Sequence, residues 1–234
     1  MTLGLLICDH VVEALRPVAG DYADMFAALF ARHGSEVSLT RYDLQQGDYP
    51  RALDECDGYL STGSRYSVYD SEPWILRFRD LVRALYQEKR KFVGICFGHQ
   101  MIAHALGGSC VKSGSGWGMG VHEVVVCAKK PWMEPEQGAY NLIVSHQDQI
   151  VALPADAERL GGNAHCPYAM VAVGDHFLGI QAHPEFNTAY VEALMQTRVE
   201  RIGRSVVQQA RRSLHKQIDE AVVVRWMVNF FRAS

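Results

Sequence analysis

Val93-Gly94-Ile95-Cys96-Phe97-Gly98-His99-Gln100 is the stretch of sequence from which the fold can be inferred. Residues 92–95 are an apolar run that predicts a buried strand, and a helical pattern of apolar residues follows the cysteine. The glycines on either side of Cys96 therefore predict a tight strand-to-helix turn with a thiol at its apex. Turns of this kind expose a reactive atom, and small neighbouring residues relieve the crowding around it.

The position of Cys96 favours a reactive role for its sulfur. A helix N-terminus beside the sulfur favours the thiolate, which is the reactive form of cysteine. The alternative is a structural cysteine in the core, which is the commoner role of a free cysteine. A second segment of the sequence bears on the choice between these two interpretations.

That segment is residues 177–185, which predict a strand that runs into an exposed end. Side chains two residues apart in an extended chain project to the same side, so His183 and Glu185 are expected to be neighbours. The carboxylate then binds one imidazole nitrogen while the other nitrogen faces a thiol. Alone, the segment would be a surface turn with a solvated acid; together with the turn at Cys96 it predicts a catalytic triad of Cys96, His183 and Glu185.

These two segments resemble the signatures of class I, triad-type glutamine amidotransferases. Two further segments support the resemblance, namely Ser61-Thr62-Gly63-Ser64-Arg65 and Ser145-His146-Gln147-Asp148. The resemblance extends over residues from about 40 to about 190 by the order of the motifs. Four signatures in the family's order are far more specific than any one of them.

The resemblance implies a mechanism. Cys96 would attack the side-chain amide of glutamine to give a γ-glutamyl thioester, and His183 would protonate the departing ammonia and then activate water. The main-chain N–H groups of Gly63 and Phe97 would form the oxyanion hole, where each donor is typically worth about 2.7–4 kcal/mol. The alternative for Gly63 is an ordinary turn glycine.

The resemblance also implies which residues hold the zwitterionic end of the substrate. That end needs both hydrogen-bond donors and acceptors, and the candidates are Gln100, Ser145, His146, Gln147 and Asp148. His146, like His99, has the alternative of a structural hydrogen-bonding role. Many members of the family carry glycine where this chain has Gln147, a difference that would reshape the pocket and bears on whether free glutamine is the natural substrate.

Three functions are compatible with these motifs. The favoured one is a stand-alone amidotransferase resembling the glutaminase domain of GMP synthases, with a separate synthetase or acceptor subunit as a partner. The second is a γ-glutamyl peptidase or hydrolase, because plant γ-glutamyl peptidases have a similar Gly-Ile-Cys-Phe-Gly-His-Gln turn. The third is a non-catalytic regulatory module, against which the complete set of nucleophile, base and carboxylate argues.

The composition limits which other classes of protein the chain can belong to. The chain has 234 residues, of which 48% are hydrophobic and 21% charged, which fits a single domain over residues 1–234. A net charge of −3 argues against a nucleic-acid partner, and no apolar run approaches the roughly 18 residues of a membrane span. Six scattered cysteines and a short N-terminal apolar run without a basic start favour the cytoplasm. No metal or cofactor motif is evident among the ten histidines and six cysteines.

Alternating strand and helix patterns predict an α/β fold. We expect a mainly parallel central sheet with helices on both faces and a smaller antiparallel extension. The predicted strands are residues 3–8, 36–41, 58–61, 92–95, 121–127, 142–145, 170–173 and 177–181, and the predicted helices include 21–32 and 73–88. The catalytic groups would lie at the carboxyl ends of strands, where open α/β sheets place their sites.

The C-terminal segment, about residues 204–232, lies outside the motifs. Its apolar residues recur at every fourth position, which predicts one or two amphipathic helices. The arginines of its first part, which include Arg201 and Arg204, are interpreted as the solvated face of a helix packed on the sheet. The alternative is an interface with a second copy of the chain or with another protein. The loop after Gly63 is expected to line the entrance of the site, with Arg65 and Tyr66 in contact with substrate or a partner.

Overall fold

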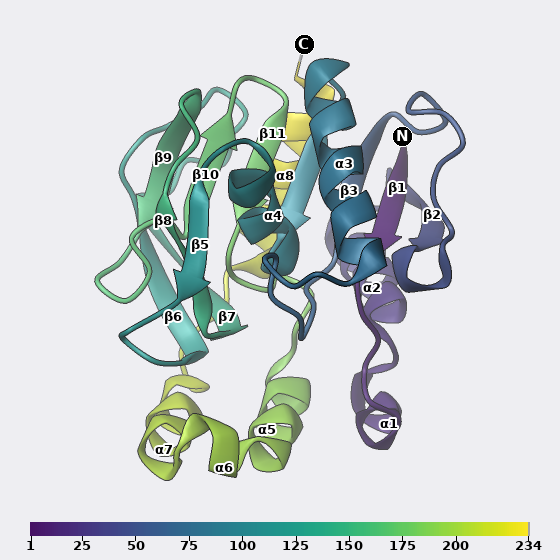
Figure 1. Ribbon diagram of the computed structural model, residues 1–234. Helices are drawn as coiled ribbons and strands as arrows, with labels where there is room; N and C mark the ends of the chain where they lie inside the picture. Colours follow the sequence, from purple (N-terminus) through teal and green to yellow (C-terminus); the bar gives the residue numbers. More distant parts are fainter. Residues whose placement is uncertain (234) are drawn as a thin grey trace.

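The computed structural model describes residues 1–233 and has a nine-stranded sheet at its centre (Figure 1). The strand order is β2-β1-β3-β4-β11-β10-β9-β6-β7. Their bounds are β1 Thr2–Ile7, β2 Ser38–Asp43, β3 Gly58–Ser61, β4 Phe92–Ile95, β6 Gly118–Val126, β7 Ala139–His146, β9 Ala157–Gly162, β10 Met170–Val173 and β11 Phe177–Ile180. A separate antiparallel pair consists of β5 (Ser109–Lys112) and β8 (Asp148–Ala152).

The sheet divides into a parallel and an antiparallel part. The five strands β2, β1, β3, β4 and β11 pair in parallel. Beyond β11, the strands β10, β9, β6 and β7 pair antiparallel. The expected fold class, a mainly parallel α/β sheet with an antiparallel extension, is confirmed.

Helices cover both faces of the parallel part. The helix α2 (Tyr22–His33) and the C-terminal helix α8 (Glu220–Arg232) pack on one face, and α3 (Pro73–Gln87) and α4 (Phe97–Ala105) pack on the other. The first strand shows why both faces must be covered: Leu3 and Leu5 belong to the core under α2 and α8, whereas Leu6 belongs to the core under α3 and α4.

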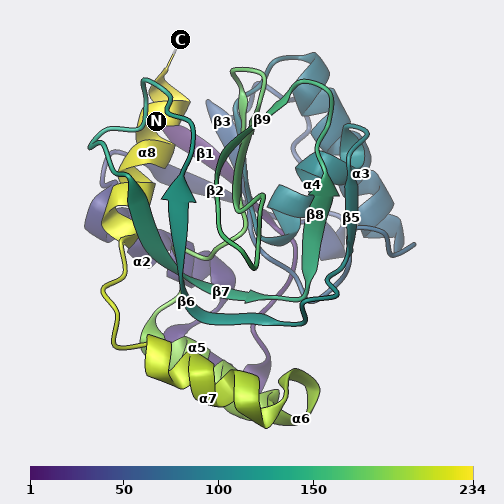
Figure 2. The same ribbon diagram turned by 90° about the vertical axis from the view of Figure 1, so that its left-hand side faces the viewer.

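A third group of helices lies at one end of the molecule, at the bottom of Figures 1 and 2. We call the helices α5 (Thr188–Thr197), α6 (Val199–Ile202) and α7 (Arg204–Ser213) the helical lobe. The lobe packs with α1 (Arg16–Ala19) and the one-turn helix η1 (Glu13–Leu15), and its apolar side chains form a third core with residues of β6 and β7. The remaining one-turn helix, η2 (Leu44–Gln46), follows β2.

The predicted elements agree with the structure where the apolar pattern is strong. The strands 58–61, 92–95 and 170–173 were predicted with their observed bounds, and the strand predicted at 36–41 begins two residues later, at Ser38. The strands β5, β8 and β9 and the helices α1, α5 and α6 were not predicted. These strands are short and carry exposed residues, so their apolar pattern is weak.

The C-terminal segment forms the two amphipathic helices expected from its period, α7 and α8. Trp226, Met227 and Val228 of α8 are fully buried, so packing against the sheet is confirmed for this helix. No helix among residues 1–233 combines the length and the apolarity that crossing a membrane requires.

Candidate active site

Cys96 lies at the junction between β4 and α4 with a strained main chain. Its φ of 50° and ψ of −96° place it in a region that side-chain-bearing residues rarely adopt. Its N–H donates to the carbonyl oxygen of Ile180 at 2.8 Å, which ties the end of β4 to the end of β11. The predicted strand-to-helix turn with a thiol at its apex is therefore present, and its strain fits a nucleophile turn.

The two glycines that flank Cys96 are required by close packing. A Cβ at Gly94 would collide with the main chain of Gly98, and a Cβ at Gly98 would collide with the hydroxyl of Ser61 on the neighbouring strand β3. The tight turn thus brings the start of α4 directly against β3 and β4. Any larger residue at these two positions would push Cys96 out of place.

His183 and Glu185 form a buried polar pair just beyond β11. The Nδ1 atom of His183 lies 2.7 Å from Oε1 of Glu185. The ring of His183 stacks on Phe186 with a centroid distance of 3.9 Å and an interplanar angle of 4°. The main-chain N–H of His183 donates to the carbonyl oxygen of Ile143 at 2.8 Å. The predicted pairing is confirmed, but the expected exposed strand end is wrong: both residues are only 4% exposed, and the ring of Phe186 covers one face of the His183 ring.

Gly63 brings the two parts of the site together. It follows β3, and a Cβ at this position would lie 2.7 Å from Cε1 of His183 and 3.4 Å from Cβ of Cys96. The imidazole and the cysteine therefore border the same small space. The structure places Cys96, His183 and Gly63 after the adjacent strands β4, β11 and β3, at the carboxyl edge of the sheet.

The charges around His183 favour its protonated form. Burial lowers the pKa of His183, but the negative charges of Glu185 and Cys96 raise it, and the net result is a pKa well above the ordinary value of 6.5. Because Glu185 occupies Nδ1, the second ring nitrogen is the one left for Cys96. This arrangement can take a proton from the sulfur and pass it to another group in the space beside Gly63.

Two main-chain N–H groups stand beside this space. Among residues 1–233, the N–H of Gly63 donates to no other group, and that of Phe97 is in the first turn of α4, where a helix leaves its donors unpaired. The loop at Gly63 is held in place by Thr62, whose hydroxyl donates to the carbonyl of Gly63 and accepts from the N–H of Cys8. The two predicted oxyanion donors therefore belong to the loop at Gly63, which borders Cys96, and to the first turn of α4.

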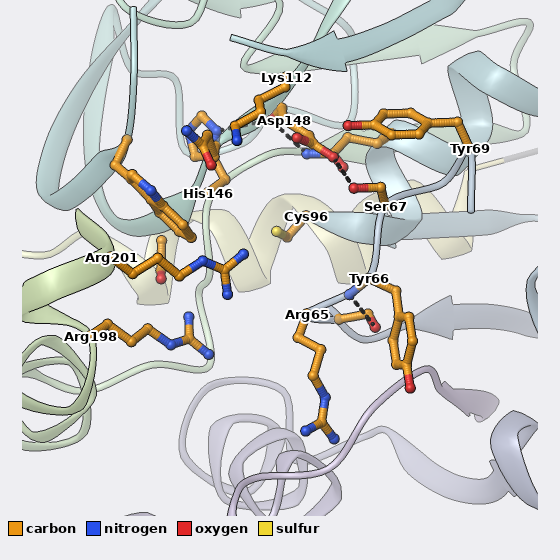
Figure 3. A pocket seen from close by; sticks show the side chains of 15 residues that line it. Arg65, Tyr66, Ser67, Tyr69, Cys96, Lys112, His146, Asp148, Arg198 and Arg201 are labelled. Carbon is orange, nitrogen blue, oxygen red and sulfur yellow. Dashed lines mark hydrogen bonds between the residues drawn. The ribbon is translucent and has the colours of Figure 1, made fainter. Parts of the chain in front are cut away.

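A cavity of about 260 Å³ opens in front of Cys96. Figure 3 shows the sulfur of Cys96 among the side chains that line it, with Ser67, Tyr69 and Asp148 on one side and Arg198 and Arg201 on another. The residues predicted to bind substrate all line this cavity, namely Gln100, Ser145, His146, Gln147 and Asp148. The cavity is thus formed between the sheet edge, the loop after β3 and the helical lobe.

The predicted binding residues differ in their partners. The amide nitrogen of Gln100 donates to the carbonyl oxygen of Asp148 at 2.8 Å and to the side chain of Gln181 at 3.0 Å. The hydroxyl of Ser67 donates to Oδ2 of Asp148 at 2.5 Å. The hydroxyl of Ser145 is buried and has no partner within residues 1–233, so it is free to bind a ligand.

His146 is buried and neutral. Burial lowers its pKa to about 3, and its Nδ1 lies 3.1 Å from the carbonyl oxygen of Asp148. Its other ring nitrogen has no partner within residues 1–233. His99, the other histidine with a structural alternative, is fully buried, and burial likewise lowers its pKa to about 3.

The loop after Gly63 lines the cavity as expected, through Arg65, Tyr66 and Ser67. Arg65 is also fixed by Asp9. The guanidinium of Arg65 donates to both carboxylate oxygens of Asp9, at 2.7 to 3.1 Å, and the main-chain N–H of Arg65 donates to the same carboxylate at 2.8 Å. Trp74 packs against the rings of Tyr66 and Phe97 and so anchors the loop.

Sequence reasoning missed three cations of the cavity wall. Lys112 ends β5, Arg198 follows α5, and Arg201 lies in α6. Arg201 was interpreted as part of a solvated face; its side chain is indeed exposed, and it also lines the cavity. The basic run was a visible signal, but the direction of its side chains depends on how the lobe packs. Within residues 1–233, no three histidine, cysteine or acidic side chains are arranged to hold a metal ion.

Comparison with known proteins identifies relatives of this site. Residues 22–202 match the family model of class-I glutamine amidotransferases. The chain is 31% identical to γ-glutamyl peptidase 3 of Arabidopsis thaliana over 193 residues, which cover 79% of this chain and 76% of the peptidase. It is 30% identical to the glutamine-hydrolysing GMP synthase of Streptococcus pneumoniae over 130 residues, which cover 55% of this chain but only 24% of the synthase.

The fold has solved counterparts. A glutamine amidotransferase of Thermotoga maritima superposes with a TM-score of 0.77 over 100% of this chain and 99% of the other, at 20% sequence identity. At this identity the likeness establishes the shared fold.

Proposed function

Because the chain belongs to the class-I glutamine amidotransferase family, we propose that it hydrolyses the amide bond of a γ-glutamyl compound with Cys96 as the nucleophile. The observation that carries this proposal is the position of Cys96 at a strained turn, beside the buried pair of His183 and Glu185 and facing a cavity. A structural core cysteine would need neither the strain nor the neighbouring imidazole.

The first half of the reaction breaks the amide. The sulfur of Cys96, whose proton His183 takes, attacks the γ-carbonyl carbon of the substrate and forms a carbon–sulfur bond. The carbonyl oxygen becomes an oxyanion that accepts hydrogen bonds from the N–H groups of Gly63 and Phe97. His183 then gives its proton to the amide nitrogen, the carbon–nitrogen bond breaks, and a γ-glutamyl thioester is left on Cys96.

The second half regenerates the cysteine. His183, again neutral, takes a proton from a water molecule whose oxygen attacks the thioester carbon. The carbon–sulfur bond breaks, the γ-carboxyl group of glutamate forms, and the sulfur recovers a proton from His183. Glu185 holds Nδ1 throughout and compensates the charge on the ring when His183 is protonated.

The glutamyl end of the substrate is proposed to bind on the side of Gln100, Ser145 and Asp148. Their side chains and main chain offer both donors and acceptors, which the amino and carboxylate groups of a glutamyl unit require. The free hydroxyl of Ser145 is a buried group that gains a partner when substrate binds.

We propose γ-glutamyl amino acids or peptides as the substrates. Support comes from the relatives named γ-glutamyl peptidases, which match along most of their length, whereas the GMP synthase matches over only 24% of its own. The side chain of Gln147, which lines the cavity, gives this chain a pocket different from that of members with glycine there. The second candidate is a glutaminase that delivers ammonia to a partner synthetase, which family membership and the GMP synthase match favour.

The deciding experiment measures glutamate release by the purified chain from glutamine and from a series of γ-glutamyl dipeptides. We expect faster turnover of the dipeptides, and none by a Cys96→Ala variant. The matched control is Cys127→Ser, because Cys127 is exposed and does not line the cavity; this variant should retain full activity. Turnover of glutamine alone would favour the glutaminase, and binding without turnover would exclude both enzymes in favour of a regulatory module.

A further inference from the structure

Two arginines of the helical lobe extend into the cavity. Arg198 follows the last residue of α5, and Arg201 lies one turn later, in α6. The main-chain N–H of Arg201 donates to the carbonyl oxygen of Arg198 at 3.0 Å. Residues three apart share a face of a helical turn, so the two side chains leave the lobe in a similar direction. In Figure 3 both guanidinium groups reach from the lobe toward the space in front of Cys96.

Arg198 lies near His183, the residue that protonates the leaving nitrogen in the proposed mechanism. A second, smaller cavity beside the first is lined by His183 and also by Cys96 and Arg198, so Arg198 borders both spaces. In the proposed mechanism His183 protonates the leaving nitrogen, which must therefore pass beside Arg198. In the proposed function, the glutamyl end binds instead on the side of Gln100 and Asp148.

The charge of these arginines is not neutralised by the protein. Within residues 1–233, neither Arg198 nor Arg201 forms an ion pair, whereas the neighbouring acids Glu200 and Glu192 face Arg204 and Arg211. Asp148 is the one acidic side chain in the wall of the main cavity, and it accepts a hydrogen bond from Ser67. A pocket with uncompensated positive charge attracts anionic ligands.

Arg201 is also held in place before any ligand binds. Its guanidinium carbon lies 5.0 Å from the centroid of the Trp117 ring, which is itself part of the cavity wall. A cation over an aromatic face is stabilised by the ring, and a group fixed in advance loses less freedom on binding.

The third cation of the cavity wall without an ion pair among the described residues, Lys112, lies in a different part of the wall. It pairs in register with Asp148 between β5 and β8, and Figure 3 shows it beside His146 and Asp148, across the cavity from the two arginines. It is therefore near the glutamyl end, where the α-carboxylate of the substrate is expected. One carboxylate cannot contact both sides at once, so an anion bound by the arginine pair would be a second one.

We propose that Arg198 and Arg201 bind a carboxylate on the part of the substrate that leaves with the nitrogen. The chain would then prefer γ-glutamyl amino acids or peptides that have a free carboxyl terminus over the same compounds with a neutral amide there. This inference rests on the proposed function for the position of the scissile bond. Guanidinium groups suit the task because they bind a carboxylate with two parallel hydrogen bonds.

Binding can be measured without turnover in the Cys96→Ala variant. Calorimetric titration with γ-glutamylglycine and with its carboxyl-terminal amide compares two ligands that differ in one charge. A charge-assisted hydrogen bond corresponds to about a tenfold gain in affinity or more, so we expect the acid to bind at least about tenfold more tightly. Arg198→Gln and Arg201→Gln in the same background should each reduce this ratio toward one.

Arg204→Gln is the matched control. Arg204 lies three residues beyond Arg201, but its side chain is 89% exposed and faces Glu200, so its loss should leave the ratio unchanged. Far-ultraviolet circular dichroism checks that the lobe remains folded in each variant. Equal affinities for acid and amide in the Cys96→Ala protein would overturn the proposal, as would a ratio that Arg204→Gln lowers as much as Arg198→Gln does.

Turnover by the chain with Cys96 intact separates this inference from the proposed function. We expect kcat/KM to favour the acid by about tenfold or more, mainly through KM, because the contact exists before the bond breaks. Cleavage of acid and amide at equal rates would overturn the arginine site and leave the hydrolase standing. Tighter binding of the acid with no cleavage of either compound would overturn the hydrolase and leave the arginine site standing.

Discussion

The Nδ1 atom of His183 lies 2.7 Å from Oε1 of Glu185, with side chains 5% and 0% exposed. In so dry a place a charged imidazole is stable only with its carboxylate, and removing one partner leaves the other uncompensated. The pair also fixes which ring nitrogen faces Cys96. Several consequences of this arrangement, and of the packing around it, can be measured.

The pH profile depends on Glu185. Burial lowers the pKa of His183, but the charges of Glu185 and Cys96 raise it above 6.5, so the ring should stay protonated into the alkaline range. We expect the alkaline limb of kcat/KM to lie above the ordinary range of histidine and to move to lower pH in Glu185→Gln. His183→Ala should lose about 10²–10⁴-fold in kcat, more than Glu185→Gln. A limb that does not move would contradict the pairing.

Gly63 should tolerate no side chain. In Gly63→Ala the new Cβ would lie 2.7 Å from Cε1 of His183, so the imidazole or the loop must shift. A displacement of this kind costs on the order of 10²-fold in kcat, and we expect at least that loss, together with a fall of about 1–3 kcal/mol in the free energy of unfolding from overpacking. Gly138→Ala is the control, because a Cβ there meets no atom within 4 Å. Equal activity of the two variants would show that Gly63 is an ordinary turn residue.

The close contact between Gly98 and Ser61 should affect the free energy of unfolding. A Cβ at Gly98 collides with the hydroxyl of Ser61, and overpacking of this kind typically costs about 1–3 kcal/mol. We expect Gly98→Ala to lower the free energy of unfolding in urea by that amount. The additional change Ser61→Gly should restore part of it, because the two residues compete for one space.

Gly114→Ala provides the reference for this pair, since a Cβ at Gly114 meets no atom within 4 Å. It should change the free energy of unfolding by less than about 0.5 kcal/mol. Strictly additive effects of Gly98→Ala and Ser61→Gly would mean that the two residues do not interact.

His146 should make the fold sensitive to acid. Burial lowers its pKa to about 3 in the folded chain, against an ordinary value of 6.5, so the unfolded chain binds a proton that the folded chain does not. The stability that depends on neutral His146 is complete above pH 6.5 and is lost as pH falls from there toward 3. In His146→Gln the fall in the free energy of unfolding between pH 6.5 and 4.5 should be smaller by roughly 1–3 kcal/mol. Parallel pH curves in urea titrations would contradict this.

The sequence predicted the elements of the site better than their surroundings. The turn at Cys96 could be recognised because glycines flank a cysteine at the end of an apolar run, and the pair of His183 and Glu185 because of their spacing. The arginine pair could not be recognised: Arg198 stands among ordinary polar residues, and Arg201 belongs to a basic run that is typical of a solvated helix. Asp9, which holds Arg65, is likewise a single acid after a strand.

The burial of His183 and Glu185 could not be predicted from the local sequence. An extended segment that reaches the end of a strand was expected to be exposed, yet both residues are only 4% exposed: Phe186 stacks on His183, and Leu194 of α5 lines the same small cavity. Whether a later segment folds back over a strand end is a matter of tertiary packing. The sequence of the covered segment carries no pattern that indicates such packing.

The sequence by itself determined the local geometry of this protein: which runs form strands, where the chain must turn tightly, and which reactive groups stand at the turns. These follow from side-chain periodicity and from the steric demands of single residues, which act over a few positions. Only the tertiary structure decided that Cys96 meets His183, because β4 and β11 pair in parallel with Ile95 opposite Ile180. It also decided that the lobe directs two arginines into the cavity, since the choice of packing partners depends on the whole chain.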